Sequence, residues 1–212
     1  MTRAALERIA AALERLAPPT PTPTDWLSAP AFIWEGTTAR AVPTLAAVPL
    51  DRLHGITAQK VALRDLCGRL AAGAAAHDVL LWGARGMGKS ALVRACVADV
   101  QRDAPEALAL VQLAPGALPN VPALLAELAQ QPRAFLLFID DLGFGADGRE
   151  QMLALRSLLD GGVAPRPPHI RLAVTANRRA IVAREDTSAA LHERDERDDA
   201  LALADRFGLT LG

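Results

Sequence analysis

From residue 79 to the end of the chain, short apolar runs alternate with stretches in which apolar residues recur at helical spacing. Residues 134–139 are continuously apolar, which is typical of a parallel strand buried on both faces. The pattern predicts strands over residues 79–82, 107–113, 134–139, 170–175 and 207–211, and helices over residues 91–102, 121–130 and 149–159. Strands that alternate with helices in this way favour an α/β fold with a parallel sheet.

The chain before residue 79 follows a different pattern. Residues 3–16 predict an amphipathic helix, whose apolar stripe needs a partner in the same chain or in a neighbouring subunit. Residues 17–30 are rich in Pro and Thr and predict a stiff, extended linker. Residues 31–34 form an apolar cluster that we expect to pack rather than to act. We therefore expect an N-terminal helix and linker region over residues 1–44 and an α/β core over residues 45–212, which opens with a helix over residues 57–72 capped by Thr57.

Composition narrows the class of protein. The chain has 212 residues, of which 51% are hydrophobic, and this fits one α/β domain with an appendage or two small domains. A net charge of −1 gives no basic footprint of a nucleic-acid binder. Cys67 and Cys96 lack C-x-x-C spacing, so we expect neither a metal site nor a disulfide framework. No apolar run is long enough to span a membrane, and the first predicted helix is too acidic for a signal peptide, so we expect a cytoplasmic protein.

Residues 83–90 have the spacing G-x-x-x-x-G-K-[ST] of a phosphate-binding loop, and they lie between a predicted strand and a predicted helix. Gly86 and Gly88 permit the dihedrals that turn backbone N–H groups around a polyphosphate. Lys89 can reach the β- and γ-phosphates, and the Ser90 hydroxyl can ligate Mg²⁺. The alternative is a glycine turn before an ordinary helix, with Lys89 in solvent. We expect the nucleotide to contact Gly83, Ala84, Arg85, Gly86, Met87, Gly88, Lys89, Ser90 and Ala91.

Acidic and amide side chains follow two of the predicted strands. Asp140 and Asp141 come directly after residues 134–139, and the carboxyl ends of parallel strands are where ligands gather. We expect Asp140 to hold Mg²⁺ and Asp141 to activate the attacking water. Asn177, or else Thr175, would position that water at the end of the fourth strand. The alternative interpretations are a solvated acidic turn and an ordinary strand-end turn.

Three further polar segments carry weaker signals. Arg206 could reach the γ-phosphate of a neighbouring subunit and stabilise transition-state charge, or it could simply pair with Asp205. His54 either contacts a nucleotide base or is structural. Residues 184–199 are strongly acidic and predict a solvated loop or helix rather than a binding surface.

In this order, these motifs resemble the Walker A, Walker B, sensor 1 and arginine-finger elements of the AAA+ branch of P-loop ATPases. The chain resembles more narrowly a bacterial AAA+ family known only as a domain of unknown function. The resemblance covers about residues 45–212. The segments that carry it are 81–86, 138–142, 159–162, 175–179 and 205–209.

The resemblance implies a P-loop three-layer sandwich with the strand order 5-1-4-3-2. Two departures from the AAA+ pattern stand out. Walker B usually reads Asp-Glu, whereas Asp141 is one methylene shorter, so turnover is expected to be slow. The helical lid that follows the arginine finger in the family is absent from these 212 residues, either truncated or lost.

These observations favour Mg²⁺-dependent ATP binding and hydrolysis by an AAA+ core that remodels an unknown protein or nucleic-acid partner. The resemblance implies a homo-oligomeric ring if the full protein has a lid, with Lys89, Asp141, Asn177 and Arg206 as catalytic residues and Ser90 and Asp140 as magnesium ligands. The alternative is a loader or adaptor module that binds ATP with little turnover. A small-molecule kinase fits less well, because no acceptor pocket or lid follows residue 140.

Overall fold

The computed structural model describes residues 2–5, 7–8, 23–142, 148–160, 166–177 and 205–212. Of the predicted helix over residues 3–16, residues 3–5 and 7–8 are described, and they are helical. The predicted acidic segment over residues 184–199 lies outside the described part of the chain.

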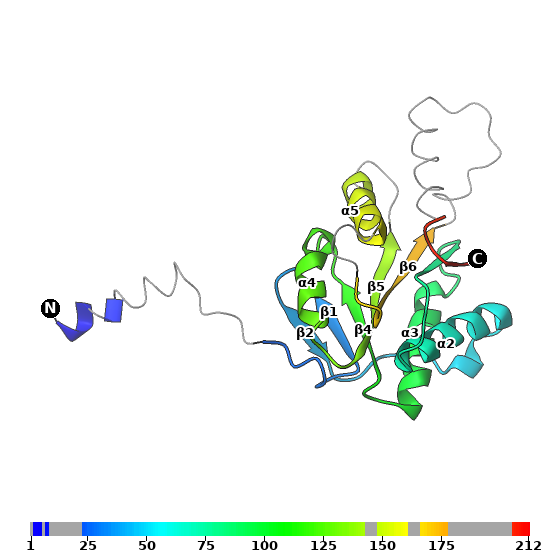
Figure 1. Ribbon diagram of the computed structural model, residues 1–212, viewed down its shortest axis with the longest axis horizontal. Helices are drawn as coiled ribbons and strands as arrows, with labels where there is room; N and C mark the ends of the chain where they lie inside the picture. Colours follow the sequence, from blue (N-terminus) through cyan, green and yellow to red (C-terminus); the bar gives the residue numbers. More distant parts are fainter. Residues whose placement is uncertain (1, 6, 9–22, 143–147, 161–165, 178–204) are drawn as a thin grey trace, which may run out of the picture.

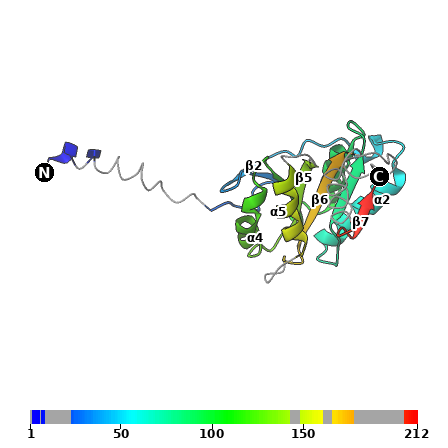
Figure 2. The same cartoon turned by 90° about the horizontal axis from the view of Figure 1, so that it is seen from above.

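In the described part of the chain, a sheet of seven strands forms the centre of the fold (Figure 1). The strands are β1 (Ala31–Trp34), β2 (Ala39–Val42), β3 (Val79–Gly83), β4 (Leu108–Leu113), β5 (Ala134–Leu142), β6 (Ile170–Asn177) and β7 (Leu209–Leu211). Their order is β2-β1-β4-β5-β6-β3-β7, and Figure 2 shows β2, β5, β6 and β7 in this succession across the sheet. All neighbouring pairs are parallel except β1 and β2. The five strands from β3 onward therefore have the predicted order 5-1-4-3-2.

Helices cover both faces of the sheet and complete three layers (Figure 1). They are α2 (Thr57–Ala71), α3 (Lys89–Asp103), α4 (Val121–Leu128) and α5 (Gly148–Asp160). Alternate residues of each strand point to opposite faces, so that Leu81 packs with the α2 and α3 side chains and Leu80 with those of α4. The prediction that Thr57 caps α2 is wrong. Thr57 is the first helical residue, Ile56 occupies the N-cap position, and no side chain makes a capping hydrogen bond there.

Residues 31–42, which precede the predicted core, are part of this sheet. Residues of β1 pair in parallel with residues 110–113 of β4, and β2 adds an antiparallel edge strand. The apolar cluster over residues 31–34 therefore packs, as predicted, but it does so as a strand that the sequence analysis did not identify. The division of the chain at residue 44 stays a prediction. Strands from both sides of this residue belong to the same sheet.

One buried arginine fastens the segment before β1 to the sheet. Arg133 is 3% exposed, and its guanidinium donates to the carbonyl oxygens of Trp26 (3.0 Å) and Ala29 (2.7 Å) on one side. On the other side it donates to those of Pro105 (2.8 Å) and Leu108 (2.9 Å). Burial lowers the pKa of Arg133, because desolvation disfavours the charged form. The side chain thus satisfies four backbone carbonyls that the packing of three segments brings together.

Candidate functional site

The predicted phosphate loop joins β3 to α3. Gly86 and Gly88 have φ values of 83° and 85°, which place both in the left-handed region. A Cβ atom at either position would meet no heavy atom within 4 Å, so space does not require glycine there. The backbone conformation does, because an L side chain rarely adopts such φ values. The loop is therefore shaped by these two residues, and α3 begins at Lys89 directly after it.

The only lysine in this loop lies folded against it. Lys89 Nζ donates to the carbonyl oxygens of Gly83 (2.8 Å) and Ala84 (3.0 Å). The ammonium group is thus held next to the loop backbone and the first turn of α3. A cation and a helix N-terminus at the same place form an electropositive site that suits an anionic ligand.

The carboxylate of Asp140 faces this site from the neighbouring part of the sheet. Ser90 Oγ, in the first turn of α3, donates to Asp140 Oδ1 at 2.6 Å. Thr175 Oγ1, on β6, donates to the same oxygen at 2.7 Å. The two residues predicted to bind magnesium are therefore in contact, and the hydroxyl of Thr175 belongs to the same group.

Asp141 lies in an irregular part of β5. Its φ is 56°, and the register between β5 and β6 shifts between Ile139 and Leu142. The Asp141 N–H donates to Thr175 Oγ1 at 2.8 Å, and Asn177 Nδ2 donates to Asp141 Oδ1 at 2.5 Å. The predicted strand over residues 134–139 thus continues to Leu142 through a bulge, which directs Asp140 and Asp141 to different partners.

The structure brings most of the predicted catalytic and magnesium-binding residues together, at the carboxyl ends of β3, β5 and β6. Arg206 lies elsewhere: its Nε is 2.9 Å from Asp160 Oδ1 at the end of α5, and its side chain is 34% exposed. The alternative to a role at a neighbouring subunit was an ion pair with Asp205, and the structure shows a pair with Asp160 in its place. A role for Arg206 at a neighbouring subunit stays a prediction.

A cavity of about 450 Å³ adjoins the phosphate loop on the side of β7. Its walls, which the sequence pattern did not predict, come from segments far apart in the chain. Gln59 Nε2 closes one side by donating to the Gly212 carbonyl at 2.7 Å. His54 is exposed and is not among the residues that line the cavity. Besides the loop itself, these include Ile56, Gln59, Leu81, Trp82, Leu92, Leu211 and Gly212.

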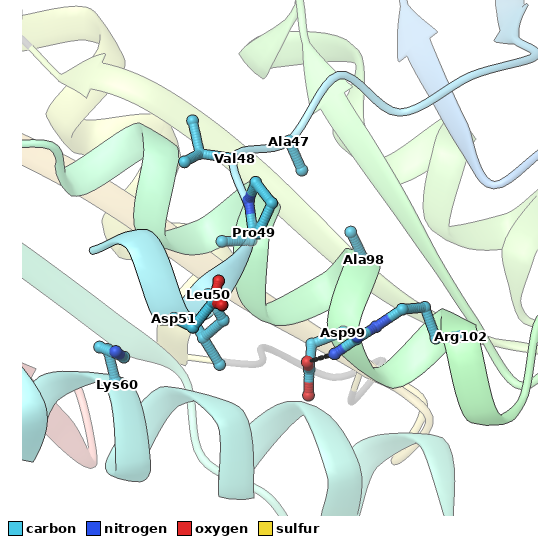
Figure 3. Close-up of a pocket in the computed structure, with 10 residues that line it drawn as sticks. Ala47, Val48, Pro49, Leu50, Asp51, Lys60, Ala98, Asp99 and Arg102 are labelled. Carbon is cyan, nitrogen blue, oxygen red and sulfur yellow. Dashed lines mark hydrogen bonds and ion pairs between the residues drawn. The ribbon is translucent and has the colours of Figure 1, made fainter.

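A second hollow, of about 640 Å³, lies between residues 47–51 and α3 (Figure 3). Three of its polar side chains, those of Lys60, Asp99 and Arg102, bond to protein groups. Lys60 Nζ donates to the Leu53 carbonyl at 3.0 Å, and Asp99 accepts from Arg102, as the dashed line in Figure 3 shows, and also from Arg64. Two carboxylates, Asp51 and Asp99, line this hollow, and no glycine loop or α-helix N-terminus is among its lining residues, so it suits a phosphate less well than the site at Lys89.

The two cysteines are unsuited to act as nucleophiles or metal ligands. Cys67 and Cys96 are buried and free, and burial raises the pKa of both thiols, that of Cys96 to about 12. In the described parts of the chain, no three His, Cys, Asp or Glu residues gather in a way that could hold a metal ion by themselves. Within the same residues, no helix has the length and apolar character needed to cross a membrane.

Comparison with solved structures gives distant likenesses. The chain matches the structure of Rhizobiales Trip13 (18% identity, TM-score 0.47) over 76% of its own length and 62% of that chain. It matches the Thermotoga maritima RuvB Holliday junction branch migration motor (20% identity, TM-score 0.42) over 79% of its own length and 48% of that chain. It matches the crystal structure of DnaI (16% identity, TM-score 0.42) over 79% of its own length and 89% of that chain. No curated protein matches. At such identities and scores, these likenesses carry no functional inference.

A family model gives a firmer result. The model described as "Protein of unknown function (DUF815)" matches residues 27–212, which include β1, the phosphate loop and Arg206. The match begins before the predicted core, in agreement with the place of β1 in the sheet. With the strand order 5-1-4-3-2 and the phosphate loop after its first strand, the chain has the AAA+ P-loop fold and belongs to the family described as a protein of unknown function, DUF815.

Proposed function

We propose that this chain binds ATP with Mg²⁺ and hydrolyses it as the core of an AAA+ oligomer that remodels a protein or nucleic-acid partner in the cytoplasm. The observation that carries the proposal is the 2.6 Å contact between Ser90 and Asp140, at the start of the helix whose first residue, Lys89, holds its ammonium group against the phosphate loop. A hydroxyl, a carboxylate and a lysine at the end of a glycine-shaped loop are the groups that phosphoryl transfer from ATP requires.

The phosphate-binding groups follow from the geometry of the loop. The backbone N–H groups of residues 84–91 and Lys89 would hold the β- and γ-phosphates, while the Gly86 and Gly88 conformations keep that backbone open to them. Ser90 and Asp140 would hold the magnesium ion. Their oxygen ligands suit it, because Mg²⁺ usually takes one or two protein oxygens and completes its shell with phosphate and water. When bound, the ion neutralises charge that develops on the phosphates.

Asp141 and Asn177 would act on the water that attacks the γ-phosphate. The Asn177 amide holds one carboxylate oxygen of Asp141, which leaves the other to accept a proton or a hydrogen bond from water. The adenosine part of the nucleotide would enter the neighbouring cavity, whose walls include Ile56, Trp82 and Leu211. Apolar walls with a single amide, that of Gln59, suit a flat purine base.

Replacing Asp141 by Asn is expected to lower ATP turnover about 100-fold or more and to leave the Kd for ATP within about threefold. Asparagine tolerates the left-handed backbone of this position but cannot accept a proton. Phosphate release and calorimetric binding would be measured on the same preparations. Asp103→Asn, which removes a carboxylate that is 78% exposed at the other end of α3, is the matched control. Equal turnover in the Asp141 variant and the wild type would refute the assignment.

Arg206 is expected to act between subunits. Turnover per chain should then rise with protein concentration, and Arg206→Ala should lower it about 1,000-fold, because transition-state charge loses its partner. Arg40→Ala on the edge strand β2, which removes an arginine that is 61% exposed, is the control.

Mixing the inactive Arg206→Ala and Asp141→Asn chains separates a role in the neighbouring subunit from a role in the same one. An Arg206→Ala chain keeps its own Asp141, and an Asp141→Asn chain can supply the missing arginine. Recovery of turnover in the mixture is therefore expected. No recovery, with mixed assembly shown by cross-linking, would place the arginine's effect within its own chain.

A loader or adaptor that binds ATP with little turnover is the second candidate. The short side chain of Asp141 and its 2.5 Å contact with Asn177 favour it, because both restrict the reach of the carboxylate toward water. Stoichiometric ATP binding with no phosphate release at any protein concentration would select this module over the ATPase. Concentration-dependent release would select the ATPase.

A further inference from the structure

One polar side chain at this site is almost completely buried. Thr175 is 1% exposed and lies near the carboxyl end of β6, between the strand that carries the phosphate loop and the strand that carries both aspartates. A buried hydroxyl is costly unless its hydrogen-bonding capacity is used. A valine has nearly the same size and would need no hydrogen-bond partner, so the hydroxyl itself needs a reason.

Both sides of this hydroxyl are engaged. A threonine hydroxyl has one hydrogen to donate, and Thr175 Oγ1 gives it to Asp140 Oδ1 at 2.7 Å. The same oxygen accepts the backbone N–H of Asp141 at 2.8 Å. With its one hydrogen committed to a carboxylate, the hydroxyl cannot also donate to an attacking water. The geometry therefore does not favour Thr175 for positioning the water, a role the sequence offered as second choice after Asn177.

The hydrogen bond that Thr175 accepts comes from the N–H of Asp141, the residue other than glycine with a positive φ in the described part of the chain. Asp141 has a φ of 56°, an arrangement that costs a residue other than glycine about 1 kcal/mol or more. The register between β5 and β6 shifts at the same place, so a regular ladder bond is not available to the Asp141 N–H. The Thr175 hydroxyl provides the missing acceptor and so stabilises the bulge.

We infer that Thr175 is a positioning residue for the magnesium ligands: it fixes the bulge of β5 so that Asp140 faces Ser90. One hydroxyl holds the Asp140 side chain and the Asp141 backbone at once, and therefore sets the direction of the first carboxylate relative to the phosphate loop. This inference rests on the proposed function, since it concerns the same ATP and magnesium site.

The test measures how much Mg²⁺ strengthens ATP binding. The Kd for ATP is determined by calorimetry with Mg²⁺ and with EDTA, for the wild type, Thr175→Val and Thr175→Ser. Valine has nearly the same shape without the hydroxyl, and serine restores the hydroxyl without the methyl group. Thr210→Val, on the exposed side of the edge strand β7, is the matched control.

Thr175→Val is expected to reduce the magnesium-dependent gain in affinity about tenfold or more, because groups that orient a metal ligand typically contribute 10- to 100-fold. Its Kd in EDTA should stay within about twofold of the wild type, and Thr175→Ser should recover most of the gain. A merely structural role would weaken ATP binding equally in both conditions.

Three results would overturn the inference: a full magnesium gain in Thr175→Val, an equal loss with and without Mg²⁺, or no recovery in Thr175→Ser. Failure of the proposed function has a different signature, seen in the wild type alone. A wild type that binds no ATP in either condition, or binds it equally in both, would remove the nucleotide or magnesium site and this inference with it.

Discussion

Replacing Lys89 by Ala is expected to weaken ATP binding at least 100-fold, about 2.7 kcal/mol at 25 °C. The ammonium group lies against the carbonyl oxygens of Gly83 and Ala84, at the place where the phosphates would lie. Alanine brings no positive charge to this place. The loop conformation depends on Gly86 and Gly88 and should persist in the variant. Calorimetric titration with ATP in Mg²⁺ measures the loss.

The chain offers a closely matched control, because Lys60 is its only other lysine. Lys60 bonds to the Leu53 carbonyl at the second hollow, away from the phosphate loop, so Lys60→Ala should bind ATP like the wild type. Wild-type affinity in Lys89→Ala would contradict the assignment of the loop to phosphate binding. An equal loss of ATP affinity in both variants would indicate that the net charge of the protein, rather than the phosphate loop, determines ATP binding.

Replacing Arg133 by Met is expected to destabilise the fold by about 3–5 kcal/mol, since it removes a donor from the carbonyl groups of Trp26, Ala29, Pro105 and Leu108, of which Leu108 keeps the Gln101 amide at 2.9 Å. For a chain of this size, that corresponds to a fall in Tm of roughly 10 °C. Methionine fills a similar length but donates no hydrogen bond. Thermal and urea unfolding, followed by tryptophan fluorescence, would measure the change, because Trp26 lies on one of the bonded segments.

Arg102→Met is the control for this experiment. Arg102 also pairs with a neighbour, Asp99, but its side chain is 74% exposed, and such surface pairs contribute about 0–1 kcal/mol. The two variants remove the same charge from the same residue type. If both lowered the Tm equally, the bonds of Arg133 to the carbonyls of residues 26 and 29 would not stabilise the fold as argued.

The parts of the site that the sequence predicted depend on local signals. The glycines and the lysine of the phosphate loop act within eight residues, and their spacing encodes the turn and the helix start directly. Residues 134–139 predict a buried strand by composition alone, and the acids that follow this strand must then lie at the edge of the sheet where ligands bind. The sheet order came from the family resemblance, because neither spacing nor periodicity determines which strands become neighbours.

The parts that were missed depend on contacts between distant segments. β1 has only four residues, and its pairing with β4 leaves no periodic signal in the sequence. The cavity joins Gln59 to Gly212, and Arg206 pairs with Asp160 rather than with the adjacent Asp205. The role of Thr175 depends on a bulge in a neighbouring strand, and the positive φ of Asp141 cannot be recognised from residue type alone.

The position of β3 has a consequence for how the chain folds. Its neighbours in the sheet are β6 and β7, which come last among the strands of the described residues, so β3 is made long before either of them. At ribosomal speeds, its apolar Val79–Gly83 segment waits on the order of ten seconds for residues 170–177. Closing such long loops is slow, and unpaired apolar strands aggregate. The phosphate loop, which begins at the end of this strand, would therefore be among the last parts to mature, and folding should benefit from a chaperone that shields β3 until β6 arrives.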